Sequence, residues 1–247
     1  MDLSTGNGGL SDRGRMWTGP FEVTFISETG STNADLLAGA SDLPHGTVLV
    51  ADRQTAGRGR LDRAWESAPI DPDRGPNLLA SILFKSGLAG PHRLMQRVGI
   101  AAARACERVA GVSPSLKWPN DLLLGEAKLA GILAQAGGGS GRIDHVVVGI
   151  GLNVAWAPPG AAHLPCGHRD DVLGALLEAL ADLPEPHLDE YRRLLGTLGT
   201  AVRVEMIGET LAGLAIDVDD DGHLIVDTPT GVRSVGVGDV VHLRRIE

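Results

Sequence analysis

The sequence predicts an α+β fold: a mixed β-sheet domain with helices, followed by a small β-barrel-like domain. Before residue 200, short apolar runs alternate with segments of helical periodicity. A glycine-rich turn at 137–141 joins two apolar runs, for which an antiparallel pair is the simplest connection. From Val202 onward, short strands and turns replace the helices. We therefore expect one domain over residues 21–200 and a second over 201–247.

The elements before the first loop follow from local signals. Residues 1–20 are polar and carry no periodic pattern, so we expect a disordered N-terminal arm. Phe21 to Ser27 alternates in the manner of a strand. Ser31 or Thr32 is suited to cap the short helix that follows. The apolar run from Thr47 to Asp52 predicts a buried strand, which leads into a loop rich in glycine and arginine.

The later elements also have recognisable limits. Asn77 to Lys85 is apolar enough for a central strand. Between Pro91 and Gly111 apolar residues recur at helical spacing, with proline and glycine at the positions that start and stop helices. Two more helices are predicted around 173–180 and 188–198. In the C-terminal part, Asp221-Gly222 is typical of a hairpin turn.

Composition limits the classes of partner. Hydrophobic residues make up 43% and charged residues 21%, as in soluble globular proteins. The net charge of -9 repels nucleic acid, anionic membranes and ATP, so any anion site must be built locally. We expect no membrane partner, because no run of eighteen apolar residues occurs. We expect no nucleic-acid partner either, because the polar N-terminal residues cannot form a DNA-binding domain. Two distant cysteines, Cys106 and Cys166, indicate a reducing cytoplasm.

The loop from Gln54 to Trp65 is the most informative stretch. It contains Gly57, Arg58, Gly59, Arg60, Arg63 and Trp65. Glycine lets the backbone approach a ligand closely but loses entropy on ordering, whereas arginine offers planar donors to carboxylates and phosphates. We expect the loop to be mobile alone and ordered by an anionic ligand. A solvated surface loop and a nucleic-acid contact are the alternative interpretations.

Five motifs occur in a fixed order along the chain. They are STN (31–33), Q-x-x-G-R-G-R-x-x-R-x-W (54–65), KWPND (117–121), KLAGIL (128–133) and GIGLNV (149–154). Together they resemble the biotin protein ligases, of the short type without an N-terminal DNA-binding domain. The resemblance implies a mixed β-sheet with helices related to class II aminoacyl-tRNA synthetases, followed by an SH3-like domain.

The resemblance also implies an activity. Family enzymes join biotin to ATP, release pyrophosphate and hold biotinyl-5′-AMP. They then transfer biotin to one lysine of an apo biotin carboxyl carrier domain of acetyl-CoA or other acyl-CoA carboxylases. Two anions must meet, and unit charges at 4 Å repel by roughly 4 kcal/mol at an effective dielectric of 20, so local cations are required. ATP and Mg²⁺ are the implied cofactors, and a monomer or weak homodimer is expected.

By resemblance, three residues carry catalysis: Lys128, Arg60 and Arg63. Lys128 is expected to bridge the biotin carboxylate and the α-phosphate. The implied biotin-binding residues are Ser31, Thr32, Asn33, Gln54, Gly57, Arg58, Gly59, Arg60, Lys128 and Gly131. The implied ATP-binding residues are Arg63, Trp65, Lys117, Asn120 and Asn153. Asp121 is the implied ligand of Mg²⁺.

Several of these residues have a purely structural alternative. Trp65 is nearly as well explained as a core aromatic. Ser31 and Thr32 are ordinary helix caps, and capping can coexist with binding. Asn153 could satisfy a loop, and residues 120–121 suit a turn after proline. Lys128 is less suited to a plain surface position, because it precedes an apolar run.

The chain departs from its relatives at two places. Leu61-Asp62 stands where many relatives have arginine and glycine, so we expect a stiffer loop and weaker ligand retention. Ala134-Gln135 stands where relatives often have an acidic residue, which puts any role of that position in doubt.

The sequence lacks the motifs of several other functional classes. The chain has no P-loop and no dinucleotide fingerprint. His163, Cys166 and His168 are interpreted as incidental and not as a metal site. A lipoate or octanoate ligase of related fold and a non-catalytic carrier-binding module remain the alternatives.

Overall fold

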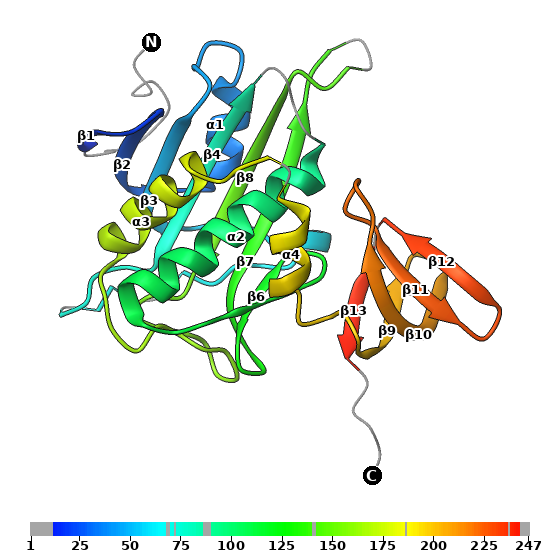
Figure 1. Cartoon of the computed structure of the whole chain (residues 1–247). Helices are drawn as coiled ribbons and strands as arrows, with labels where there is room; N and C mark the ends of the chain where they lie inside the picture. Colours follow the sequence, from blue (N-terminus) through cyan, green and yellow to red (C-terminus); the bar gives the residue numbers. More distant parts are fainter. Residues whose placement is uncertain are drawn as a thin grey trace.

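The computed structural model describes residues 12–67, 70–71, 73–85, 90–139, 142–185, 187–236 and 238–242. Its largest element is an eight-stranded sheet (Figure 1). In spatial order the strands are β1 (Asp12–Thr18), β2 (Phe21–Thr29), β3 (Thr47–Gln54), β4 (Leu78–Lys85), β8 (His145–Leu152), β7 (Ala127–Gly137), β6 (Asp121–Leu124) and β5 (Ser115–Lys117). Only β2 and β3 pair in parallel, and the crossover between them contains a helix. The remaining neighbours are antiparallel, including the predicted β7–β8 pair.

In the described part of the chain, the α-helices that pack with this sheet are α1 (Thr32–Gly39), α2 (Pro91–Ala110), α3 (Arg169–Ala181) and α4 (Leu188–Leu194). The helix α1 lies on one face, and α2 and α3 lie on the other (Figure 1). Strand residues are buried on both faces in alternation: Val48 and Val50 join the α2 side, whereas Leu49 joins the α1 side. The mixed α and β architecture predicted from the sequence is confirmed.

The limits of the helices follow their sequence signals. The prediction for α2 is confirmed: Pro91 is its first residue, and Gly111 ends it at φ 66°, a left-handed conformation that glycine adopts readily. The prediction for α4 extended too far. That helix ends at Leu194 because Leu195 forms a β-bridge with Leu116, and the amide of Gly196 donates to the Leu116 carbonyl.

The predicted disordered arm over 1–20 is wrong for its second part. Residues 12–18 form β1, which pairs antiparallel with β2. Gly19 turns the chain between the two strands at φ 57°. An edge strand offers unpaired backbone groups that any extended segment can satisfy, so β1 does not need an apolar pattern. Residues 1–11 lie outside the described part of the chain.

A second, five-stranded antiparallel sheet begins at Ala201, next to the domain boundary expected at residue 200. In spatial order its strands are β12 (Gly231–Val235), β11 (Leu224–Thr228), β10 (Glu209–Val218), β9 (Ala201–Met206) and β13 (Asp239–His242). It contacts the first sheet through the buried Trp118, whose indole N–H donates to the Gly222 carbonyl at 3.0 Å. Among the helices described, none is long and apolar enough to cross a bilayer.

Candidate active site

A cavity of about 520 Å³ lies between the glycine-arginine loop, strands β6 to β8, the start of α1 and the C-terminal sheet. Every residue named above as a candidate for catalysis, biotin, ATP or metal lines this cavity, except Gly57. These residues come from motifs that are spread along the chain from residue 31 to residue 153. The fold therefore brings together what the sequence keeps apart.

The floor of the cavity is a pair of glycines. Gly131 of β7 and Gly151 of β8 are directly opposite each other in the antiparallel register. A Cβ on Gly151 would lie 2.3 Å from Cε2 of Trp65, and one on Gly131 would lie 3.1 Å from its Cζ3. The indole of Trp65 therefore packs closely against strands that lack side chains at this point. Lys128 Nζ lies 5.7 Å from the centroid of the same indole, within cation–π range.

One end of the cavity is a network of neutral hydrogen bonds. The backbone N–H of Thr32 donates to Gln54 Oε1 at 2.8 Å, and the Thr32 hydroxyl lies 2.7 Å from the Ser81 hydroxyl. Ser81 donates to Asn33 Oδ1 at 2.6 Å, and Asn33 Nδ2 donates to Gln135 Oε1 at 2.9 Å. Asn33 and Thr32 are buried. This network holds each amide and hydroxyl in one orientation, so its donors and acceptors are fixed before any ligand meets them.

The structure clarifies two sequence expectations at this end. Ser31 is the N-cap of α1 and accepts a hydrogen bond from the Ala34 amide at 3.5 Å, so the predicted capping is confirmed. Gln135, the position where relatives were expected to carry an acidic residue, supports Asn33. Ser81 was missed, because a serine inside an apolar strand pattern carries no local signal of its partner.

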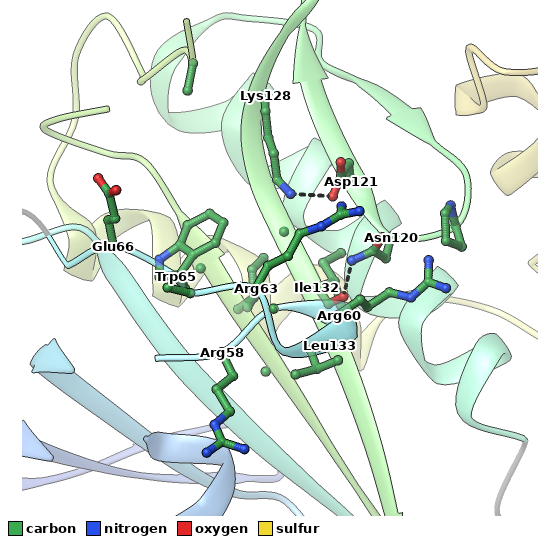
Figure 2. Close-up of a pocket in the computed structure, with 18 of the residues that line it drawn as sticks. Arg58, Arg60, Arg63, Trp65, Glu66, Asn120, Asp121, Lys128, Ile132 and Leu133 are labelled. Carbon is green, nitrogen blue, oxygen red and sulfur yellow. Dashed lines mark hydrogen bonds and ion pairs between the residues drawn. The ribbon is translucent and has the colours of Figure 1, made fainter. Parts of the chain in front are cut away.

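The opposite end of the cavity is cationic. Lys128 Nζ forms an ion pair with Asp121 Oδ1 at 2.7 Å (Figure 2). Arg60 and Arg63 extend from the loop on the same side, whereas Arg58 points away from them (Figure 2). Lys117, at the end of β5, adds a further cation to the lining. A local group of cations was expected from the sequence, because the net charge of the chain is negative. Such a group is present on one wall of the cavity.

The loop itself is folded into a compact turn. The amide of Gly59 donates to the Arg63 carbonyl at 2.7 Å, and the amide of Trp65 donates to the Gly57 carbonyl at 2.9 Å. A Cβ on Gly57 would lie 2.9 Å from the Trp65 carbonyl oxygen, so this glycine permits the close approach without lining the cavity. Leu61 has φ 53°, which is costly for a branched side chain. This strain lies at one of the two positions where the chain departs from its relatives.

The C-terminal sheet completes the cationic wall. Arg60 Nη1 donates to the Gly238 carbonyl at 3.1 Å and lies 3.6 Å from Asp239 Oδ1. Arg63 forms an ion pair with the same carboxylate. Burial lowers the pKa of Arg60, and the carboxylates of Asp239 and Asp121 oppose that change. Sequence reasoning missed Asp239, because no local pattern links it to a loop more than 170 positions earlier.

Two asparagines that were predicted to bind the nucleotide donate hydrogen bonds to backbone carbonyls. Asn120 Nδ2 donates to the Ile132 carbonyl at 3.0 Å (Figure 2), and Asn153 Nδ2 donates to the Ala162 carbonyl at 2.9 Å. The loop-satisfying interpretation of Asn153 is therefore correct, and its place in the lining leaves binding open as well. Asn77 was missed: its Oδ1 accepts from the amides of residues 154, 155 and 156 and holds the segment after β8.

The residues can accommodate a metal ion only in part. Asp121 presents one carboxylate to the cavity, and that carboxylate is paired with Lys128. The described residues include no group of three side chains arranged to bind a metal ion, around His163, Cys166 and His168 or elsewhere. Mg²⁺ commonly takes one or two protein carboxylates and completes its shell with phosphates and water.

Two family models match the chain. The model described as the Biotin/lipoate A/B protein ligase family matches residues 22–153. The model described as the Biotin protein ligase C terminal domain matches residues 197–243. The first match spans the eight-stranded sheet from β2 to β8 and leaves out β1, and the second spans the five-stranded sheet.

Similar proteins agree with these matches. The chain is 36% identical to the biotin–[acetyl-CoA-carboxylase] ligase of Mycobacterium tuberculosis over 90% of each chain. It is 29% identical to the bifunctional ligase/repressor BirA of Escherichia coli, over 91% of this chain and 75% of that protein. Its structure resembles that of the Aquifex aeolicus biotin protein ligase in complex with biotin and ATP, with a TM-score of 0.73 at 26% identity, covering 90% of this chain and 98% of that one.

Proposed function

The chain belongs to the biotin/lipoate A/B protein ligase family, and from this premise we propose that it is a biotin protein ligase. It activates biotin with ATP to biotinyl-5′-AMP and then transfers the biotinyl group to a lysine of a biotin carboxyl carrier domain. One observation carries the proposal. A single cavity has a network of neutral hydrogen bonds at one end and Lys128, Arg60 and Arg63 at the other.

The two ends suit the two ends of biotin. The ureido ring is neutral and needs both donors and acceptors, which Thr32, Asn33 and Gln54 supply at the polar end. The valerate carboxylate is an anion and would reach the cationic end. Trp65, packed against the glycine floor, offers an apolar wall.

Activation requires two anions to react. A carboxylate oxygen of biotin attacks the α-phosphorus of ATP, the bond from that phosphorus to the bridging oxygen breaks, and pyrophosphate leaves with the electron pair. Lys128 and Arg60 would lower the repulsion, because both cations line the cavity in which the two anions are proposed to meet, and the Arg60 side chain is largely buried. Lys128 must exchange Asp121 for the reacting oxygens at this step.

The second step moves the acyl group. The neutral amine of the carrier lysine attacks the acyl carbon, the bond from that carbon to the phosphate oxygen breaks, and AMP leaves. The amine loses its proton to solvent. Arg60 and Arg63 cover the acyl-phosphate until the carrier arrives, which protects it from hydrolysis.

Magnesium would enter with the phosphates of ATP. Asp121 is the lining carboxylate to which we assign the ion, and the ion would offset the charge of the β- and γ-phosphates. We also propose a cytoplasmic location. Both cysteines are free, and burial raises the pKa of the Cys106 thiol to about 12.

A lipoate or octanoate ligase is the second candidate, because the matching family model includes both activities. The polar network favours biotin, since a dithiolane ring or an alkyl chain offers nothing to hydrogen-bond with it. Isothermal titration with biotin, lipoate and octanoate distinguishes the two. Preference for lipoate or octanoate would overturn the assignment.

The catalytic proposal is tested by intact mass. An apo biotin carboxyl carrier domain incubated with the enzyme, ATP and biotin is expected to gain one biotinyl group. Lys128→Ala should reduce the rate at least a thousandfold, about 4 kcal/mol of transition-state stabilisation. Lys85→Ala is the matched control, because Lys85 lies on β4 and its Nζ donates to the Ser41 carbonyl, outside the cavity lining. No biotinylation by the wild-type enzyme, or full activity in Lys128→Ala, would contradict the proposal.

A further inference from the structure

The carboxylate of Asp239 is shared between two arginines of the glycine-arginine loop. It lies 3.6 Å from Arg60 Nη1 and forms an ion pair with Arg63, while the adjacent Gly238 carbonyl accepts from Arg60 at 3.1 Å. The side chains of Arg60 and Asp239 are only 17% and 21% exposed. This contact joins the C-terminal sheet to the glycine-arginine loop that borders the cavity.

Asp239 is held in place by rigid elements. It is the first residue of β13 and pairs with Glu205 of β9 in the antiparallel register. The same sheet is attached to the catalytic domain at a second point, where the Trp118 indole donates to the Gly222 carbonyl. Trp118 stands inside the KWPND motif, directly after Lys117 and before Asn120. The carboxylate therefore has a defined position relative to the cavity.

The two guanidinium groups need such a partner. Burial is the main cause that lowers the pKa of Arg60, the like charge of Arg63 adds to it, and the carboxylates of Asp239 and Asp121 act in the opposite direction. Without the carboxylate, the favourable response is for the loop to open and place the charges in water. The glycines of the loop impose little resistance to that movement.

We propose that Asp239 is a positioning residue, which holds Arg60 and Arg63 over the cavity. Through this contact, the C-terminal sheet helps the enzyme to retain the reaction intermediate. The second half of this inference rests on the proposed function, whereas the first half does not. Asp239 does not touch the reacting atoms, and its effect passes through the two arginines.

Hydrogen exchange of the protein without added ligand tests the first half. The amides of Gly59, Arg63 and Trp65 donate hydrogen bonds inside the loop, so their exchange reports whether the turn is held closed. In Asp239→Ala and Asp239→Asn, exchange over residues 57–65 is expected to rise about tenfold, the effect of losing one charge-assisted interaction. Asp239→Glu should restore protection in part. Asp227→Ala, at an exposed site on β11 of the same sheet, is the control and should leave the loop unchanged.

The second half is tested by the lifetime of the intermediate. Labelled biotin and ATP are mixed with enzyme, and escape of biotinyl-5′-AMP into solution is followed after a chase. Asp239→Asn should release it about tenfold faster, with the melting temperature within a few degrees of wild type. Equal loop exchange in wild type and Asp239→Asn would overturn the positioning role, and equal release would overturn the retention role. If the wild type forms no adenylate, the proposed function fails, while the exchange result still decides the role of Asp239.

Discussion

The glycine floor of the cavity and the hydrogen-bond network beside it, together called the floor from here on, are built from paired strands and buried polar groups. The cationic wall belongs to a loop that ion pairs join to another sheet. In the floor, Gly131 and Gly151 face each other across β7 and β8, and Ser81 and Asn33 are buried. In the wall, Arg63 has a side chain that is 67% exposed, and its ion-pair partner belongs to the C-terminal sheet. The two regions serve one cavity but are held by interactions of different strength.

The difference in strength has a consequence for function. A buried polar group that loses its hydrogen-bond partner costs about 1–3 kcal/mol, while an ion pair with an exposed side chain, such as that of Arg63, contributes about 0–1 kcal/mol. The floor should therefore keep its shape with or without ligand. The wall should open and close at low cost, which is what a site needs when it must admit two substrates and then shield their product.

The largest effect is expected from filling the floor. In Gly151→Ala the new Cβ would lie 2.3 Å from Cε2 of Trp65, so the indole must leave its place. We expect a loss of about 1–3 kcal/mol in the free energy of unfolding. A fall of at least about tenfold in biotin affinity should accompany it, by 1.4 kcal/mol per tenfold. Urea unfolding and isothermal titration measure the two quantities.

Gly174→Ala is the control for that substitution. Gly174 lies in α3, and a Cβ there would meet no atom within 4 Å, so alanine should be neutral or slightly stabilising. If Gly151→Ala bound biotin as tightly as wild type, the glycine floor would not be part of the binding surface.

The next effect concerns the hydrogen-bond network of the floor. Ser81→Ala removes the donor to Asn33 Oδ1 and the partner of the Thr32 hydroxyl. We expect about 1–2 kcal/mol lower stability and weaker biotin binding, because buried polar atoms lose their partners. Ser234→Ala, at an exposed position of β12, should change neither. Full retention of stability in Ser81→Ala would show that the network is not a rigid unit.

A change in the wall should separate function from stability. Arg60→Ala removes a cation from the cavity, and we expect biotinyl-5′-AMP to escape about tenfold faster while the free energy of unfolding changes by less than about 1 kcal/mol. The chase experiment and urea unfolding measure both. A large loss of stability in Arg60→Ala would contradict the division between floor and wall.

The smallest effect should come from pH, at the attachment of the C-terminal sheet. Burial lowers the pKa of His92 in α2, and the charges around it are His223, Arg60, Asp219 and Asp221. Because the unfolded chain then binds a proton more readily, the stabilisation is present above the ordinary pKa of 6.5 and is lost as pH falls through the lower folded-state pKa. We expect a loss of less than about 1 kcal/mol between about pH 7 and 5.5. His92→Asn should reduce this slope, and an unchanged slope would contradict the assignment.

Local sequence patterns were enough to predict much of the fold and of the site. The apolar period and the Pro91 and Gly111 signals determine α2, and a glycine-rich turn determines that β7 and β8 are antiparallel. The motif residues were predicted to share one site, and all of them except Gly57 line the cavity. These features can be predicted from the sequence because each depends on residues that are neighbours along the chain or on a motif with recognisable chemistry.

Tertiary structure alone decided the partners of those residues. The pairing of β1 with β2, the contact of Ser81 with Asn33, and the placing of Asp239 against Arg60 all join segments through geometry that no local pattern encodes. A strand edge accepts any extended backbone, a buried hydroxyl needs only a partner within reach, and a carboxylate pairs with whichever cation the fold brings near. The sequence therefore determined which chemical groups the site contains, and the packing of two sheets determined which of them hold one another.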